Sequence, residues 1–261
     1  MGRFNKNIQV MKNLKYISII IGFALLVFVI VYYRPKTETV PLPEVPVGET
    51  GTEMEGATKP IELCFAQFGT PDENGFYDKY TLRLLLDGEK VTGELNFLPA
   101  EKDKKVGEIE GTVGVVDPKM MARKADLWWY SFAEGMNVKE ELKIIFGEGI
   151  ASIGFGEMKD RGDGVYVYKD PTKISYNLEL TDVACGDLIE RTNVEEYLRE
   201  NIVTLSPVGA VLGGKWYYMS AIIDLEKNSG LVIYEDGHIQ EKRNFSYTLD
   251  TKGEVQSLII K

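Results

Sequence analysis

The sequence predicts an all-β protein, mainly an antiparallel meander, with one or two short helices and an N-terminal transmembrane helix. Two observations support the β prediction. From Ile61 onward, short alternating or β-branched runs are separated by glycine, and turn signals recur at spacings typical of a meander, sandwich or barrel. A closed or nearly closed barrel is the preferred form because closure removes exposed strand edges. The membrane prediction rests on one long uncharged apolar run at residues 16–33.

The apolar run YISIIIGFALLVFVIVYY begins and ends in tyrosine. As a helix rising about 1.5 Å per residue, it would just span the hydrocarbon core of a bilayer, with tyrosines at the headgroups. A cleaved signal peptide is the main alternative. Arg34 and Pro35 follow the run at once, however, without the small-residue pattern that such a peptide needs for cleavage. We therefore expect an uncleaved anchor at residues 16–33.

The flanking charges predict the orientation of the anchor. Four basic residues and no acid precede it: Arg3, Lys6, Lys12 and Lys15. We expect residues 1–15 to stay in the cytoplasm and residues 34–261 to be extracytoplasmic, so that the chain is a single-pass protein of the cell membrane with the lipid bilayer as one partner. Met11 is a second plausible start, and either start leaves this topology unchanged.

Residues 34–60 are expected to be a linker. Residues 35–60 hold five of the ten prolines and little apolar surface, a composition that does not fold on its own. In an extended polyproline-like state the segment could reach roughly 80 Å from the membrane.

Residues 61–190 are assigned to a barrel-like domain that opens with a hairpin. Strands at 80–86 and 90–97 flank Asp87-Gly88, a pair that supplies the positive φ values of a tight turn. Further strands are expected at residues 106–116, 141–146, 150–155, 165–168 and 174–180. Glycines inside these strands predict bulges or corners of a curved sheet: Gly93, Gly111, Gly114, Gly154 and Gly156.

Residues 118–134 fit two structures. Asp117-Pro118 resembles a helix start, and apolar residues follow at helical spacing: Met121, Ala125, Trp128, Phe132 and Met136. The residues from Lys124 to Phe132 also alternate as a strand. The periodicity slightly favours the helix, although an all-β context can override it.

Residues 191–261 are expected to form a helix and a C-terminal β segment, which either packs on the barrel or makes a small second domain. Thr192 and Glu195 fit a capping box for a helix over 193–202. Strands are predicted at residues 215–225, 230–235, 238–249 and 254–260.

Charge and composition exclude several functions. The net charge is −10, and residues 61–261 carry 23 basic and 35 acidic side chains, a balance of −12. Such a chain repels phosphate backbones, so nucleic acid is not an expected partner. One histidine and two cysteines cannot build a four-ligand zinc site, and no nucleotide or nucleophile-elbow motif occurs. We expect no cofactor and no catalytic residue.

The two cysteines, Cys64 and Cys185, flank the barrel-like region. In an oxidising compartment a disulfide is the default for such a pair, with two buried thiols as the alternative. A bridge closing about 120 residues would stabilise the fold by up to roughly 4 to 5 kcal/mol in the chain-entropy model.

Three acids are weak candidates for a metal site: Glu157, Asp160 and Asp163. They could converge on calcium, although their spacing is not that of an EF-hand and a polar hairpin turn explains them as well. His238 beside Glu235 and Asp236 could form an acid/base dyad, but a hairpin turn with solvated acids is the preferred interpretation.

Aromatic clusters could line a ligand pocket: Trp128-Trp129, Trp216-Tyr217-Tyr218 and Tyr166 with Tyr168. Core packing is the preferred use of such side chains.

Five segments resemble an uncharacterised family of bacterial membrane-anchored or secreted proteins. They are LPAEKD (98–103), AEGMNVKEELKIIFGEG (133–149), FGEMKDRGDGVYVYKD (155–170), LGGKWYY (212–218) and YEDGHIQ (234–240). The resemblance implies no activity and transfers no site residue. The strand-and-glycine pattern is also similar to calycin-like barrels, an analogy of fold only.

These observations predict a non-enzymatic extracytoplasmic β domain that binds a small ligand or an envelope protein, or has a structural role. The alternative is an extracytoplasmic carboxylate-dependent hydrolase. A hollow apolar barrel would favour binding, and two carboxylates facing each other across a cleft would favour hydrolysis. A filled barrel without a cleft would favour a structural role.

Overall fold

The computed structural model describes residues 59–100 and 102–261, which belong to one compact unit (Glu55–Lys261). The predicted cytoplasmic N-terminus at residues 1–15, the anchor at residues 16–33 and nearly all of the linker lie outside the described residues. Among the helices that are described, none has the length and apolar character needed to cross a bilayer.

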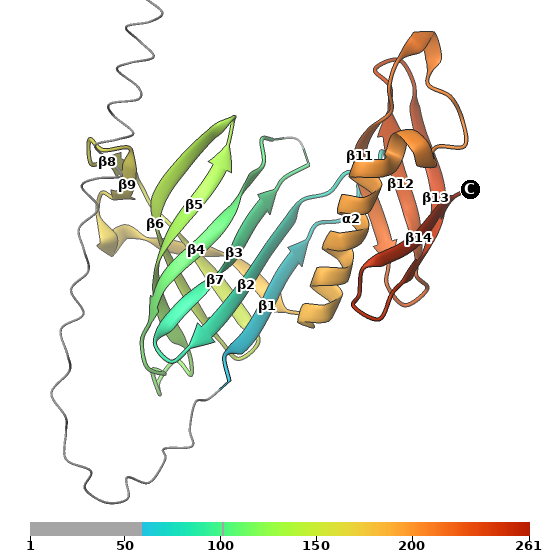
Figure 1. Cartoon of the computed structure of the whole chain (residues 1–261). Helices are drawn as coiled ribbons and strands as arrows, with labels where there is room; N and C mark the ends of the chain where they lie inside the picture. Colours follow the sequence, from blue (N-terminus) through green and yellow to red (C-terminus); the bar gives the residue numbers. More distant parts are fainter. Residues whose placement is uncertain (1–58, 101) are drawn as a thin grey trace, which may run out of the picture. The chain divides into compact units, whose positions relative to one another are not determined.

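Eight antiparallel strands close into a barrel (Figure 1): β1 (Ile61–Phe68), β2 (Lys79–Asp87), β3 (Lys90–Leu98), β4 (Lys105–Val113), β5 (Arg123–Ala133), β6 (Met136–Gly147), β7 (Ile150–Phe155) and β10 (Ser175–Asp182). Each strand from β1 to β7 pairs with the next, and β10 closes the ring between β7 and β1. The predicted antiparallel meander and its closure are confirmed. Between β7 and β10, the short strands β8 (Met158–Asp160) and β9 (Val165–Tyr168) precede a 3-10 turn, η1 (Pro171–Lys173).

The barrel interior is filled with apolar side chains. Alternate residues of each strand point inward, as in β2, where Leu82, Leu84 and Leu86 are buried while the residue that follows each of them is exposed. One continuous cluster includes these leucines together with Ile109, Leu127, Trp129, Ile144, Phe146 and Ile153. An eight-stranded barrel is just wide enough for side chains to fill, and this one is packed in that way.

The predicted hairpin at residues 80–97 is confirmed, with Gly88 at φ 63° in the turn. Inside β3, Gly93 has no room for a side chain, because a Cβ there would overlap the carbonyl oxygen of Arg83. Glycine at this position lets β2 and β3 approach where the sheet curves. The strand predicted to run to residue 116 ends at Val113, and Val115 and Val116 are exposed.

The slight preference for a helix over residues 118–134 is wrong, because this segment contains β5. Ala125, Leu127, Trp129 and Ser131 are buried at a period of two. Of the five apolar residues that suggested a helical face, only Ala125 is buried. Pairing with β4 on one side and β6 on the other satisfies the backbone of β5 and overrides the local helical pattern.

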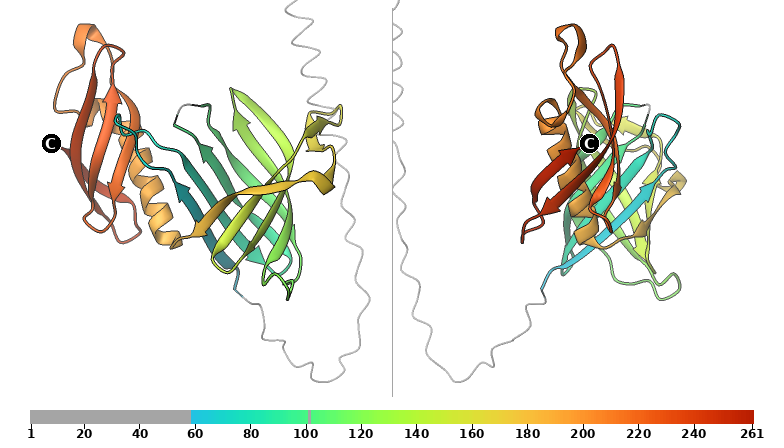
Figure 2. Two further views of the ribbon diagram at one scale, coloured as in Figure 1. Left: turned by 180° about the vertical axis from the view of Figure 1, so that it is seen from behind. Right: turned by 90° about the vertical axis from the view of Figure 1, so that its right-hand side faces the viewer.

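The C-terminal strands form a separate sheet beside a long helix (Figure 2). The helix is α2 (Cys185–Leu205), and the sheet has the order β11 (Tyr217–Asp224), β12 (Ser229–Glu235), β13 (Gln240–Leu249) and β14 (Val255–Ile260), after a 3-10 turn η2 (Val211–Gly213). Val194, Leu198 and Ile202 of α2 join the sheet's core around Phe245. The C-terminal strands therefore do not extend the barrel.

The helix predicted at residues 193–202 exists but starts earlier, at Cys185. The predicted capping box is wrong, since the Thr192 hydroxyl donates to the Leu188 carbonyl at 2.9 Å within the helix. Residues 185–190, which the prediction assigned to the barrel-like domain, therefore belong to α2.

Candidate functional site

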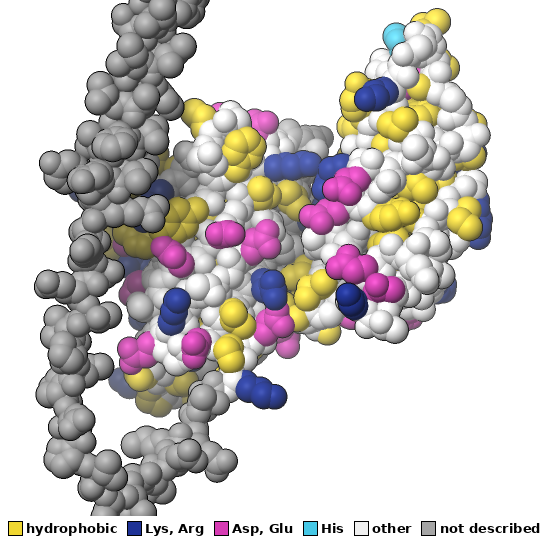
Figure 3. Space-filling view, in the orientation of Figure 1, with side chains coloured by type: hydrophobic (Ala, Val, Ile, Leu, Met, Phe, Trp, Pro, Cys, Tyr) yellow, Lys and Arg dark blue, Asp and Glu magenta, His cyan; other side chains and the backbone are white. Residues whose placement is uncertain are grey.

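A groove lies where α2 and β11 meet the outer wall of the barrel. It consists of two adjoining hollows that share Lys79, Leu98, Lys104 and Arg199, and we call it the helix–barrel groove. The first hollow has a volume of about 380 Å³ and includes Asn96, Arg191 and Glu195 in its lining. The second has a volume of about 320 Å³ and includes Tyr77, Lys102 and Tyr218. Acidic and basic side chains lie close together on the face where α2 meets the barrel (Figure 3).

Glu195 is the buried charge of the groove. It is 7 % exposed, and its Oε2 accepts a hydrogen bond from Lys79 Nζ at 2.6 Å. Its Oε1 has no hydrogen-bond partner in the described part of the chain. A buried carboxylate with half of its acceptor capacity unused is costly, which points to a donor supplied from outside the chain.

Cations line the rim of the groove. The pKa of Lys104 is lowered by burial first and then by the positive charges of Arg199 and Lys79. Arg199 lies over the Tyr218 ring at 5.2 Å, and Arg191 lies over Phe68 at 4.8 Å. Within residues 59–100 and 102–261, neither Lys104 nor Arg199 forms an ion pair. Lys104 and Arg199 therefore lie close together without a direct ion pair, while the charge of Glu195 acts on Lys104 from a distance.

Two tyrosines of the groove differ in their hydrogen bonding. The Tyr77 hydroxyl donates to the Ala221 carbonyl at 2.9 Å. The Tyr218 hydroxyl is buried without a partner among the described residues. Burial, followed by the charge of the nearby Glu195 carboxylate, raises the pKa of Tyr218.

This difference predicts opposite effects of removing the two hydroxyls. Tyr77→Phe loses a buried hydrogen bond and should lower the free energy of unfolding by about 1 kcal/mol. Tyr218→Phe removes an unsatisfied group and should leave stability unchanged or raise it. Urea denaturation of both variants measures the difference, and an equal loss in both would show that the Tyr218 hydroxyl is bonded.

Alkaline pH should unfold the protein because the fold keeps its buried tyrosines neutral. Burial is the main cause that raises the pKa of Tyr77 and of Tyr168 from 10.0 to about 12. A raised pKa means that the native state retains a proton which the unfolded chain releases, so this stability is present below pH 10 and is lost as pH rises toward 12. Unfolding and tyrosinate absorbance should rise together in that interval. Tyrosinate formation at pH 10 without unfolding would contradict the burial.

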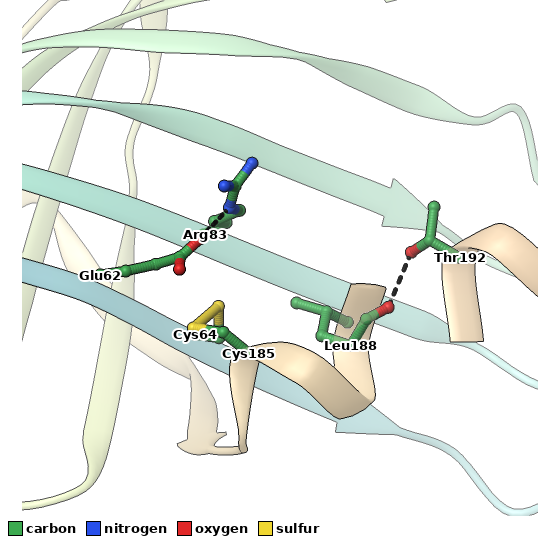
Figure 4. The surroundings of a disulfide bond; sticks show 6 residues. All are labelled: Glu62, Cys64, Arg83, Cys185, Leu188 and Thr192. Carbon is green, nitrogen blue, oxygen red and sulfur yellow. Dashed lines mark hydrogen bonds and ion pairs between the residues drawn. A yellow bond between two sulfur atoms is a disulfide. The ribbon is translucent and has the colours of Figure 1, made fainter. Parts of the chain in front are cut away.

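A disulfide between Cys64 and Cys185 fixes α2 beside the barrel (Figure 4), as predicted. The two Cα atoms are 5.2 Å apart, and the bond joins β1 to the first turn of the helix. Glu62 lies close to the two sulfur atoms. Because the sulfurs are bonded to each other, they offer no thiolate for a metal. The bridge thereby positions the helical wall of the groove.

The candidate calcium ligands occupy other roles. Glu157 pairs with Lys169, and Asp163 pairs with Arg161, each at 2.5 Å. Asp160 Oδ1 accepts from the Gly162 amide at 2.7 Å. In the described chain the ligand oxygens of these three acids do not converge on one point.

Asp236 caps a loop beside His238. Its oxygens accept from the amides of Val211 at 2.6 Å and of His238 and Ile239 at 2.9 Å. These bonds, the Ile239 amide first, lower the pKa of Asp236. The Asp236 carboxylate thus binds the backbone amides of a turn, but it is buried, whereas the hairpin-turn interpretation expected solvated acids.

Each of the three predicted aromatic clusters buries one side chain, while Tyr166 and Tyr217 are exposed. Trp129 lies inside the barrel, and the Trp216 indole donates to the Val208 carbonyl at 2.9 Å in the core of the C-terminal sheet. The Tyr168 hydroxyl donates to the Gly154 carbonyl at 2.9 Å. Only Tyr218 of these residues lines the helix–barrel groove.

The charged residues of the groove were not anticipated from the sequence. A signal was present, since Arg191, Glu195 and Arg199 recur every four residues and therefore share one face of a helix. Lys79 and Lys104 carry no such pattern, because the barrel brings them together from separate strands and loops.

A larger hollow of about 630 Å³ covers the outer wall of β2 to β5. Its acids Glu94, Glu108 and Glu110 and its Tyr130 are exposed. It is a surface depression whose polar groups reach water, so it is a weaker candidate than the helix–barrel groove.

Comparison with protein-family models, curated proteins and solved structures found no match for this chain. The resemblance to bacterial membrane-anchored or secreted proteins therefore stays a prediction from the sequence.

Proposed function

We propose that the protein is a membrane-tethered, extracytoplasmic binding module, in which a filled barrel serves as scaffold and the helix–barrel groove takes the ligand. The observation that carries this proposal is the set of buried side-chain atoms without partners in the described chain. Of the five such atoms, three belong to groove residues: Asn96 Oδ1, Glu195 Oε1 and the Tyr218 hydroxyl. Buried polar groups are nearly always satisfied, so such a concentration marks a place where something else binds.

The filled interior supports a site on the outer wall. Closed up-and-down barrels of eight antiparallel strands can hold one small ligand in the lumen. Here Leu82, Leu95 and Ile153 are completely buried in the interior cluster. We therefore place the ligand between barrel and helix.

The disulfide supports the extracytoplasmic part of the proposal, because such bonds persist in oxidising compartments. The apolar run at residues 16–33 and the linker at residues 34–60 would then tether the binding module to the cell membrane, with the bilayer as one partner and a small ligand or an envelope protein as the other.

The carboxylate-dependent hydrolase is less well supported. A general acid needs a protonated carboxyl in a suitable environment. The buried acid of the groove, Glu195, instead accepts a hydrogen bond from the Lys79 ammonium. Glu94 and Glu196, the other acids of its first hollow, are exposed.

The proposal is tested by melting the purified full chain with a panel of sugars, sugar phosphates, organic acids, amino acids and nucleotides. Thr192→Trp places a bulky side chain in the groove, and Glu200→Trp puts the same side chain at an exposed position of α2 outside the groove lining. A compound that raises the melting temperature of the wild type and Glu200→Trp, but not of Thr192→Trp, supports the proposal. A shift retained in Thr192→Trp, or no shift with any compound, contradicts it.

A further inference from the structure

The second hollow of the groove is positively charged, although the chain as a whole is negatively charged. Residues 61–261 have a balance of −12, yet the second hollow is lined by Lys79, Lys102, Lys104 and Arg199 and by no described acid. Lys79 is committed to Glu195, while Lys104 and Arg199 at the rim form no ion pair within the described residues. Cations held close to one another repel, and an anion bound beside them relieves that repulsion.

The buried polar atoms of the groove favour a hydrogen-bond donor on the ligand in addition to an anionic group. Glu195 Oε1 and Asn96 Oδ1 are hydrogen-bond acceptors without a donor, and the Tyr218 hydroxyl has no partner. A bare phosphate or carboxylate cannot donate to Glu195. A hydroxyl group can donate to this carboxylate and also accept from Tyr218, so the floor selects hydroxyls.

Resting on the function proposed above, we infer that the groove binds a small sugar or polyol carrying one phosphate or carboxylate. The anionic group lies beside Lys104 and Arg199, and the hydroxyls face Glu195, Asn96 and Tyr218. The volumes of about 380 and 320 Å³ are those of a small-molecule site. The cationic rim disfavours a metal ion, and the acidic surface elsewhere disfavours a long polyanion such as nucleic acid.

Calorimetric titration of the purified full chain tests this inference with four probes: glucose 6-phosphate, glucuronate, glucose and inorganic phosphate. We expect at least one of the two anionic sugars to bind more tightly than glucose and phosphate, and higher salt to weaken that binding. Each charge-assisted hydrogen bond contributes enough for about a tenfold change in affinity.

Two sets of variants locate the binding. Lys104→Gln combined with Arg199→Gln should weaken the anionic sugars by about tenfold or more, since both rim charges are lost. Lys90→Gln combined with Lys119→Gln makes the same change in net charge at exposed positions near the opposite end of β3 and should change affinity less than about twofold. Tyr218→Phe should weaken binding several-fold while leaving the melting temperature unchanged or higher.

The possible results separate this inference from the proposed function. If glucose binds as tightly as glucose 6-phosphate and glucuronate, the inferred anion is wrong, while a groove-dependent ligand remains. If inorganic phosphate binds as tightly as both anionic sugars, the inferred hydroxyl contacts are wrong. If no probe binds, or if the exposed control variant loses as much affinity as the rim variant, the inference falls, and the compound panel alone then decides whether the groove binds anything.

Discussion

Trp129→Ala should lower the free energy of unfolding by about 3 to 5 kcal/mol, the range for removing a large aromatic side chain from a packed core. Trp129 is 2 % exposed inside the barrel and meets the Phe97 ring edge-to-face with centroids 5.0 Å apart. Neighbouring strands hold the backbone, so the barrel cannot collapse into the space left behind. Urea denaturation followed by circular dichroism measures the loss.

The matched control is Trp128→Ala, one residue earlier on β5. Trp128 is only half-buried, and the ammonium of Lys139 lies 5.0 Å from its ring centroid. It faces away from the interior because side chains alternate along a strand. Its loss should cost less than about 1.5 kcal/mol, a typical value for a substitution outside a core. Equal losses for the two tryptophans would contradict a tightly filled interior.

Replacing both cysteines by serine should lower the free energy of unfolding by about 4 kcal/mol. The bond joins residues separated by 121 positions, and in the chain-entropy model a loop of this size gives roughly 4 to 5 kcal/mol. It also anchors the first turn of α2 to β1, so its loss should loosen the helical wall of the groove and weaken any groove ligand.

Reduction of the disulfide in the wild-type protein is the control for the Cys64→Ser, Cys185→Ser variant. A reductant should destabilise the wild-type protein by a similar amount and leave the double variant unaffected. Two thiols that react in the native protein without reductant would contradict the bridge, and a stability change below about 1 kcal/mol would contradict its structural importance.

The barrel could be predicted from the sequence where local and global signals agree. In β2 and β3 the alternation of apolar residues, the Asp-Gly turn and the pairing partners all favour one hairpin, and the predicted ends differ from the observed ends by at most one residue. The cysteine pairing followed from the expected compartment and from the lack of any other cysteine.

Prediction failed where a segment's partners decide its structure. The apolar residues around Trp128 fit a helical face, and only the strands on either side of β5 select the extended form. The start of α2 was placed at a plausible cap, whereas the observed helix begins at the disulfide-bonded Cys185, with no side-chain hydrogen bond at its N-cap.

The groove could not be predicted from the sequence for a related reason. Its residues come from β1 to β4, the segments that join these strands, α2 and β11, and they meet only after the barrel closes and the helix and the C-terminal sheet pack beside it. Charged residues such as Lys79 look like ordinary surface residues in a chain that contains 70 charged side chains, 30 basic and 40 acidic.

The central claim is that a filled barrel presents its ligand site on the outer wall, beside α2. Hydrogen–deuterium exchange of the purified full chain tests it most directly, with and without a saturating concentration of whichever binds more tightly of glucose 6-phosphate and glucuronate. We expect added protection in peptides that cover residues 98–104 and 188–199. Exchange in β6 and β7, two barrel strands that do not line the groove, should be unchanged. Added protection confined to β6 and β7, or no added protection anywhere, would contradict the claim.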